Sequence, residues 1–146
     1  MRRASVIKRV GEWDAAAIDR VVLDAGDRQR RRMVLTGEQG TVFLLDLARP
    51  EILQDGDALV LDDGAVVRVT GLPERLVEVA AGTPLALVRL AWHLGNRHTD
   101  VQIMPGALRI RRDHVLEEMV TGLGAQLTPL EAPFDPEAGS HNARDV

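Results

Sequence analysis

The sequence contains no cysteine and no tyrosine, and it has only two tryptophans and two phenylalanines. The absence of cysteine excludes disulfide bonds, thiolate metal sites and cysteine nucleophiles. The scarcity of aromatic residues means that any hydrophobic core must be built mainly from aliphatic side chains. Hydrophobic residues nevertheless make up 45% of the 146-residue chain, which is enough for a core and excludes wholesale disorder.

Long apolar runs are also lacking. No stretch of the sequence approaches the ~18 to 20 continuous apolar residues of a membrane-spanning helix. Residues 1–9 are basic, but no apolar segment follows them, so they do not have the pattern of a signal peptide. We therefore expect a cytoplasmic protein that does not bind a membrane.

Basic residues are not in surplus in either half of the chain. Residues 1–73 carry 11 basic and 12 acidic side chains (net −1), and residues 74–146 carry 7 and 10 (net −3). A nucleic-acid partner is not expected, because such proteins gain affinity largely by neutralising phosphates. One local arginine cluster has acidic residues close to it in the chain, which favours a solvated strand end over a binding patch. It consists of Arg28, Arg30, Arg31 and Arg32.

The first half of the chain consists of short segments rich in β-branched and aliphatic residues, separated by turn signals. The clearest turn is Asp62-Asp63-Gly64, because glycine tolerates the positive φ that a hairpin turn needs. The pattern ends at residues 71–74, which can serve as a linker. We predict an all-β domain over residues 1–72. The expected strands are 21–23, 33–35, 41–45, 58–61 and 65–69.

The second half alternates between strand and helix patterns. Thr83 and Pro84 provide an N-cap and a proline at the first helical position, and Gly95 is a favourable C-terminal cap. These residues predict a helix from Pro84 to about Leu94. Asp113 can cap a second helix, in which apolar side chains recur at helical spacing.

Strand patterns alternate with these helices over residues 76–81, 101–104, 107–112 and 125–130. The resulting order, βαββαβ, is the ferredoxin-like arrangement. The predicted fold class is therefore α+β, with an N-terminal all-β domain followed by a ferredoxin-like βαββαβ domain over residues 73–133. From about Glu131 the chain is polar and rich in proline, which predicts a flexible C-terminal tail over residues 134–146.

The four histidines are the most informative polar residues, because neutral imidazole is a common ligand of nickel, copper and zinc. His93 and His98 are five residues apart across a helix end, a spacing that does not by itself place both on one metal ion. Capping of the helix or a half-buried surface position explains His93 more simply. His114 opens the second predicted helix, where the positive end of the helix dipole disfavours a charged imidazole and leaves it available as a neutral ligand. His141 lies in the predicted tail.

No signature of a catalytic site is present. The motifs HExxH, paired CxxC, GxSxG, GxxxxGK[ST] and GxGxxG are all absent. The acidic pairs Asp62-Asp63 and Glu117-Glu118 fall in a turn and in the first turn of a helix, where local structure explains them. We therefore expect that the protein is not an enzyme. Two alternatives remain open from the residues alone: a metal-dependent hydrolase and a metal-free protein-interaction module.

One stretch of the second half, residues 90–98, reads LAWHLGNRH. Together with the VQIMPG, LRI, DHVLEEM and PFDPEAG segments that follow, it resembles the UreE family of urease accessory proteins, the nickel metallochaperones of urease maturation. These segments cover most of residues 90–139, and Gly-Asn-Arg-His in that setting is a specific match, whereas the first half matches only in its all-β character. The resemblance implies a homodimer with a peptide-binding type of N-terminal domain and a ferredoxin-like metal-binding domain.

The resemblance also implies roles for three histidines. His98, the histidine of Gly-Asn-Arg-His, would bind Ni²⁺ at the dimer interface together with its twin. His114 matches a position used as a secondary metal ligand in some members, and His141 resembles a tail histidine that can complete the site. The implied partners are an accessory GTPase and the urease apoprotein complex. Nickel follows from the resemblance alone, because the same ligands also hold Zn²⁺ or Cu²⁺, and Cu²⁺ binds more tightly than Ni²⁺.

Two features depart from the family's pattern. Many members end in a histidine-rich tail, whereas only His141 stands in this one, so storage of many nickel ions per dimer is not expected. Some relatives carry a histidine two residues before His114, where this chain has Arg112. We therefore expect secondary metal sites to be fewer or weaker.

The first predicted helix is apolar on two sides. Only one side can face the domain's own sheet, and an exposed apolar stripe that contains a tryptophan is typical of an interface. This pattern predicts that the metal-free protein is already a dimer. The two stripes are Leu87, Leu90, Ala91 and Leu94, and Leu85, Val88 and Trp92.

Overall fold

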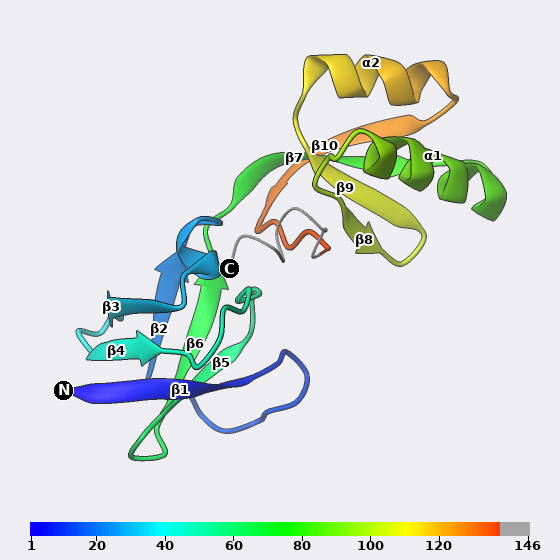
Figure 1. Cartoon of the computed structure of the whole chain (residues 1–146). Helices are drawn as coiled ribbons and strands as arrows, with labels where there is room; N and C mark the ends of the chain where they lie inside the picture. The colour runs from blue at the N-terminus through cyan, green and yellow to red at the C-terminus, as the bar shows by residue number, and fades with distance from the viewer. Residues whose placement is uncertain (138–146) are drawn as a thin grey trace. The chain divides into compact units, whose positions relative to one another are not determined.

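In a computed structural model, which describes residues 1–137, the chain forms two compact units, the first from Met1 to Leu72 and the second starting at Pro73 (Figure 1). The first contains only β-strands and a short 3-10 helix, and the second contains two α-helices and a sheet. The predicted α+β fold class is confirmed. Neither α-helix in the described part of the chain is long and apolar enough to cross a membrane.

The first unit is a six-stranded sheet in the order β2-β6-β5-β1-β4-β3. Two neighbouring pairs are parallel, β1 with β4 and β2 with β6, and the other pairs are antiparallel. The core contains buried aliphatic side chains and one aromatic ring, that of Phe43. The elements are β1 (Arg2–Lys8), β2 (Asp19–Leu23), η1 (Asp27–Gln29), β3 (Arg32–Thr36), β4 (Val42–Asp46), β5 (Ala58–Leu61) and β6 (Val66–Gly71).

The sequence does not predict β1, although this strand lies inside the sheet between β4 and β5. Ala4 is fully buried, whereas Ile7 is only partly buried at the edge of the core. The pairing of β1 with β5 shifts between Ala4 and Val6, as at a β-bulge. Such a shift breaks the strict alternation of apolar and polar residues from which a strand is predicted.

The arginine cluster is not a solvated strand end throughout, and the prediction is wrong for Arg28. This residue lies in η1, is buried, and donates a hydrogen bond from Nη1 to the carbonyl oxygen of Leu53 at 3.4 Å. Arg31 donates to the carbonyl oxygen of Leu47 at 2.9 Å. Main-chain carbonyls between β4 and β5 require donors when they are buried, and these two guanidinium groups supply them.

Asp19 ties the turn between β3 and β4 to β2. Its buried carboxylate accepts hydrogen bonds from the N–H groups of Gln39 (2.9 Å), Thr41 (3.1 Å) and Arg20 (2.7 Å). A Cβ atom at Gly37 would overlap this carboxylate, so the turn requires glycine there. Burial alone would raise the pKa of Asp19, but the hydrogen bonds, first those of Gln39 and Thr41, outweigh it and lower the pKa from 3.8 to about 2.

We expect the stability of the protein to depend on pH through Asp19. Because the folded-state pKa lies below the unfolded value, the ionised carboxylate contributes stability that is present above about pH 4 and is lost as the pH falls toward 2. Asp19→Asn should be less stable than the wild type at pH 7, and the difference should shrink between pH 4 and pH 2. Urea denaturation of both proteins across this range measures it. A difference that stays constant with pH would contradict this role of the carboxylate.

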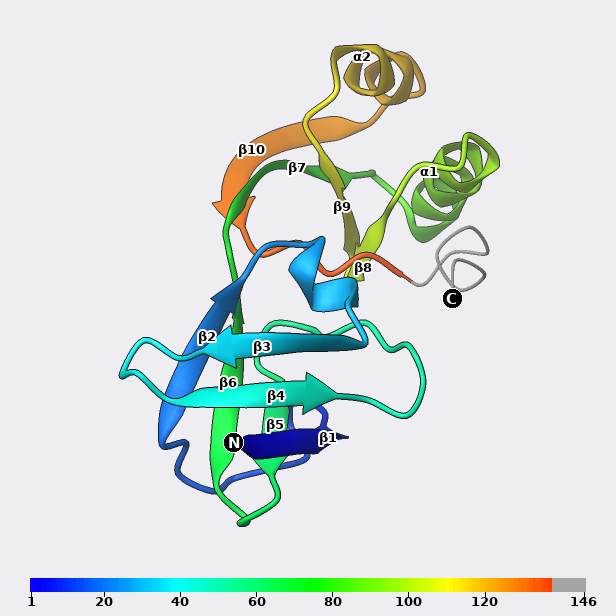
Figure 2. The ribbon, with the colours of Figure 1, turned by 60° about the vertical axis from the view of Figure 1, so that its left-hand side comes forward.

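The second unit is a four-stranded antiparallel sheet in the order β10-β7-β9-β8, with both helices on one face (Figure 2). Val77 and Val79 of β7 and Ile110 of β9 pack against Leu90 of α1 and Val120 of α2. The order of elements is βαββαβ, as predicted. They are β7 (Glu74–Ala80), α1 (Pro84–Asn96), β8 (Gln102–Met104), β9 (Ala107–Arg111), α2 (His114–Gly122) and β10 (Gln126–Ala132).

After β10 the chain crosses to the opposite edge of the sheet through residues 133–137, here called the crossing segment. Phe134 is fully buried, and its ring centre lies 4.6 Å from the guanidinium carbon of Arg111. The N–H of Asp135 donates to Oε1 of Gln102 (3.1 Å), and the N–H of Glu137 donates to the carbonyl oxygen of Val101 (2.8 Å). Residues 131–137 therefore do not form a loose tail, because burial of one aromatic ring outweighs their polar composition.

Candidate metal-binding site

His98 follows the C-terminal end of α1. Thr83 caps the start of this helix, with its Oγ1 accepting the N–H of Ala86 at 3.1 Å. The helix runs through Gly95 to Asn96, so the predicted stop at Gly95 is wrong. The left-handed residue that ends the helix is instead His98, with φ 57°.

The backbone around His98 forms a Schellman motif. The N–H of His98 donates to the carbonyl oxygen of Gly95 (3.0 Å), and that of Thr99 donates to the carbonyl oxygen of Leu94 (3.2 Å). The left-handed position of this motif is usually glycine, because other residues adopt it at a cost of about 1 kcal/mol. Among residues 1–137, His98 is the only residue other than glycine that has a positive φ. Because the imidazole is exposed, side-chain packing does not account for a non-glycine residue at this position, which makes His98 a candidate functional residue.

His114 is the first residue of α2, whose N-terminal end Asp113 caps by accepting the N–H of Leu116 at 3.0 Å. The His114 side chain is 86% exposed, and its Nε2 lies 3.1 Å from Oε1 of Glu118, one helical turn further on. Because β7 and β9 are antiparallel, α1 and α2 also run in opposite directions. The end of α1 that precedes His98 and the start of α2 therefore lie at the same end of the helical layer (Figure 1).

No three ligating side chains come together within residues 1–137 in a way that could hold a metal ion. His98 and His114 lie on separate connections, one between α1 and β8 and the other at the start of α2. His93 lies on α1 itself, half-buried, and its ring meets that of Trp92 edge to face at 5.0 Å between centroids. This contact supports the structural interpretation of His93. His141 lies outside the described residues.

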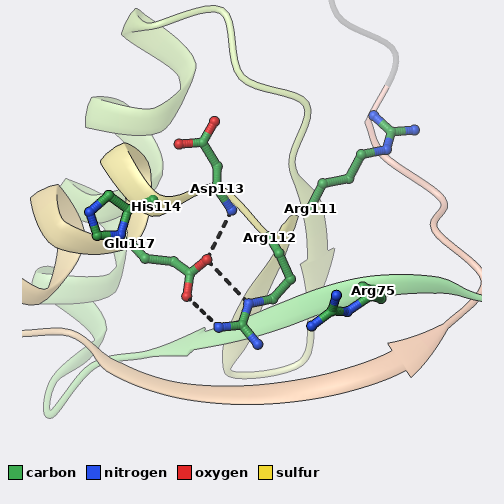
Figure 3. A pocket seen from close by; sticks show the side chains of 6 residues that line it. All are labelled: Arg75, Arg111, Arg112, Asp113, His114 and Glu117. Atoms are coloured by element: carbon green, nitrogen blue, oxygen red, sulfur yellow. Dashed lines mark hydrogen bonds and ion pairs between the residues drawn. The ribbon is translucent and has the colours of Figure 1, made fainter.

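An open hollow of about 540 Å³ lies beside His114 (Figure 3). Within it, the Arg112 guanidinium donates to both carboxylate oxygens of Glu117, at 2.9 and 3.2 Å, and the N–H of Asp113 donates to the same carboxylate at 2.9 Å. The hydrogen bond from Arg112 is the main reason why the pKa of Glu117 lies below its usual value. These contacts engage Glu117, so it is not a free ligand beside His114. The lining residues are Arg75, Arg111, Arg112, Asp113, His114 and Glu117.

Arg111, which no motif in the sequence marks, joins several parts of the second unit. Its Nε donates to Oε1 of Glu74 at 2.7 Å, and its Nη1 donates to Oδ2 of Asp100 at 3.0 Å, while its guanidinium lies over the ring of Phe134. Burial would lower the pKa of Arg111, but the hydrogen bonds and charges of Glu74 and Asp100 outweigh it and raise the pKa. In the sequence, Arg111 shows only the polar alternation of a half-buried strand, which does not identify its partners.

The outer face of α1 carries an unpaired apolar stripe, as the two-sided pattern predicts. Leu85, Val88 and Trp92 are 59%, 64% and 63% exposed. The other stripe packs against the sheet, with Leu90 and Leu94 fully buried. The exposed stripe ends at Trp92, about one helical turn before the last residue of α1, after which the chain leads to His98.

Comparison with known proteins covers nearly the whole chain. The family described as "UreE urease accessory protein, N-terminal domain" matches residues 4–71, and the corresponding C-terminal domain family matches residues 74–145. A "Urease accessory protein UreE" of Rhodopseudomonas palustris (strain HaA2) is 55% identical over 141 residues, which cover 97% of this chain and 66% of the relative.

Two further proteins of the same name are similar. That of Bradyrhizobium sp. (strain ORS 278) is 55% identical, with 97% of this chain and 67% of the relative covered. That of Beijerinckia indica subsp. indica is 44% identical, with 97% and 82% covered. The chain spans about two thirds of the length of the Rhodopseudomonas and Bradyrhizobium relatives. With both of its units matched, this chain belongs to the UreE family of urease accessory proteins.

Proposed function

We propose that this protein is a nickel metallochaperone, which binds Ni²⁺ and delivers it for assembly of the urease metal centre in the cytoplasm, and that it is not itself an enzyme. The observation that carries the proposal is His98, an exposed imidazole in the left-handed position of a Schellman motif. Family membership supports the role in urease maturation. The metal-binding chemistry belongs to the domain that begins at residue 73.

The proposed site is shared between two copies of the chain. A single imidazole on a loop holds a divalent ion weakly, and residues 1–137 of one chain offer no cluster of three ligands. A two-fold axis brings the same residue from both copies together and so doubles every ligand. The stripe of Leu85, Val88 and Trp92 supports such a contact, because it is apolar, exposed and adjacent to the end of α1 that leads to His98.

His141 is proposed as an auxiliary ligand. The backbone N–H of Glu137 donates to the carbonyl oxygen of Val101, which lies three residues after His98 in the chain. His141 follows Glu137 by four residues, and four residues span at most ~14 Å. The chain therefore leaves the described structure within reach of the loop that carries His98. His114 is proposed as a weaker secondary ligand. Its imidazole is exposed, so a metal ion can reach it, and one carboxylate, that of Glu118, lies beside it as a second ligand.

Release of the metal follows from the exposure of His98 and His114. Imidazoles on an exposed loop and at an exposed helix start can exchange Ni²⁺ with a partner without unfolding of a core. The proposed recipients are the accessory GTPase and the urease apoprotein complex. The same nitrogen ligands would also hold Zn²⁺ or Cu²⁺, so preference for nickel depends on supply and on the partner.

Calorimetric titration of the metal-free protein with Ni²⁺, Zn²⁺ and Cu²⁺ tests the proposal. We expect tight binding of one Ni²⁺ per two chains, lost in His98→Ala with an unchanged circular dichroism spectrum. Absence of any heat with Ni²⁺ would leave a metal-free interaction module as the better assignment. Turnover of generic esters or phosphates by the metal-loaded protein would point instead to a metal-dependent hydrolase.

Truncation after Glu137 should weaken nickel binding without unfolding the protein. It removes His141 but keeps the contacts that Phe134, Asp135 and Glu137 make with the rest of the second unit. We expect roughly tenfold weaker Ni²⁺ binding, equivalent to about 1.4 kcal/mol, and a nearly unchanged melting temperature. His141→Ala in the full chain is the matched control and should reproduce the loss. Wild-type affinity in both variants would remove His141 from the site, and a large drop in melting temperature would assign the removed residues a structural role.

A further inference from the structure

Hydrogen bonds at three places hold the loop of residues 97–101, here called the His98 loop, which joins α1 to β8. At its start, the N–H groups of His98 and Thr99 close the Schellman motif. In its middle, the carboxylate of Asp100 accepts a hydrogen bond from Arg111 at 3.0 Å. At its end, the carbonyl oxygen of Val101 accepts the N–H of Glu137 at 2.8 Å.

Arg111 makes the middle restraint itself and supports the segment that makes the last one. It binds Asp100 directly, and its guanidinium packs over Phe134 of the crossing segment, which continues to Glu137. Glu74 binds the remaining side of the guanidinium at 2.7 Å and so fixes its orientation. The side chains of Asp100 and Glu74 are 29% and 25% exposed and that of Arg111 is 41% exposed, so water and salt screen these ion pairs somewhat less than a fully exposed pair.

From this arrangement we propose that Arg111, acting through Asp100 and Phe134, is a positioning residue that holds His98 in its metal-binding geometry. The inference rests on the proposed function, because it assigns a role toward the metal that His98 binds. A left-handed conformation at a non-glycine residue persists only where the surroundings impose it. If the His98 loop lost the contact of Asp100 with Arg111, the backbone at His98 could relax toward the more favourable right-handed or extended regions.

The expected loss of Ni²⁺ affinity follows from the fraction of molecules in which the His98 loop keeps its metal-binding conformation. When the binding-competent state is only partly populated, the apparent dissociation constant rises by the inverse of that fraction. A loop that is in place about one third of the time lowers the affinity about threefold. A site shared by two copies needs both loops, so the total loss is about tenfold.

The matched control is a second ion pair on the same strands. Arg109 lies two residues before Arg111 on β9 and therefore faces the same side of the sheet. It binds Glu78 of β7 at 3.4 Å, and this pair links only β7 and β9. Glu78→Gln thus removes a comparable charge from a pair that includes no residue of the His98 loop or of the crossing segment.

The test compares Asp100→Asn with Glu78→Gln by calorimetric titration with Ni²⁺ and by hydrogen exchange of the metal-free proteins. Asp100→Asn should bind Ni²⁺ about tenfold more weakly and should exchange the amides of His98 and Thr99 faster, whereas Glu78→Gln should leave both unchanged. Arg111→Lys keeps the positive charge but loses the planar guanidinium that binds Asp100 and Glu74 at once. Its affinity for Ni²⁺ should lie between those of the wild type and Asp100→Asn. In the double variant with Asp100→Asn and Arg111→Lys, the two losses should not add in full, because both substitutions remove the same contact with Asp100, and any loss beyond that of Asp100→Asn measures the contribution through Phe134.

Equal Ni²⁺ affinity of Asp100→Asn and Glu78→Gln would overturn the positioning role while leaving the proposed function intact. If the wild type bound no Ni²⁺, the proposed function would fail. Amide exchange would still test whether Arg111 holds the His98 loop in place. Faster exchange at His98 and Thr99 in Asp100→Asn alone would support the role of Arg111 in holding this loop. Unchanged exchange there would overturn it.

Discussion

His98→Gly should abolish tight Ni²⁺ binding and at the same time make the protein more stable. The variant removes the imidazole from both copies of the proposed site, for which we expect at least roughly a hundredfold loss of affinity, or about 2.8 kcal/mol. It also places glycine at the left-handed position, with φ 57°, where glycine is the favoured residue. Relief of that conformational cost should add about 1 kcal/mol to the free energy of unfolding.

His98→Ala is the control that separates the two effects. It removes the same imidazole but keeps a Cβ atom in the left-handed conformation, so its free energy of unfolding should stay close to that of the wild type. Calorimetric titration measures the loss of binding, and urea denaturation of metal-free protein measures stability. Lower stability of His98→Gly would show that the conformation is not strained, and retained Ni²⁺ affinity in either variant would remove His98 from the mechanism.

Trp92→Glu should convert a metal-free dimer into monomers. Trp92 is 63% exposed in the single chain and lies in the stripe with Leu85 and Val88. Burial of an aromatic anchor at the centre of an interface contributes about 2 kcal/mol or more. A two-fold interface contains this residue twice, so the dimer should be weakened by about 4 kcal/mol, close to a thousandfold.

Val115→Glu is the matched control for the dimer. Val115 is 65% exposed, also lies on a helix of the second unit, and is outside the stripe on α1. Light scattering on metal-free protein should give a dimer for the wild type and for Val115→Glu, and a monomer for Trp92→Glu. A dimer that survives Trp92→Glu would place the contact elsewhere, and a wild type that dimerises only after addition of Ni²⁺ would show that the metal makes the interface.

Elements whose signals lie within a few residues could be predicted from the sequence. The turn at Asp62-Asp63-Gly64 and the starts of α1 and α2 are formed by local hydrogen bonds and by the φ preference of single residues, such as the positive φ of Gly64. The βαββαβ order followed from these signals. The strand β1 did not, because its place in the middle of the sheet depends on pairing with β4 and β5, and a shift in register interrupts its own alternation.

The residue types of the candidate site, His98 within Gly-Asn-Arg-His above all, could likewise be identified from the sequence and its resemblance to a family. Its geometry could not. The apparent cap at Gly95 was misleading, because the hydrogen bonds of the Schellman motif, and not the preference of one glycine, decide where the left-handed residue falls. The partners of Arg111 lie 11 residues away at Asp100 and 37 residues away at Glu74, and they meet only because antiparallel strands bring distant segments side by side. The sequence by itself thus determined which helices and strands form and which histidines are present, since these depend on local chemistry. Only the tertiary structure decided how His98 is held, because that depends on contacts between elements that no local pattern encodes.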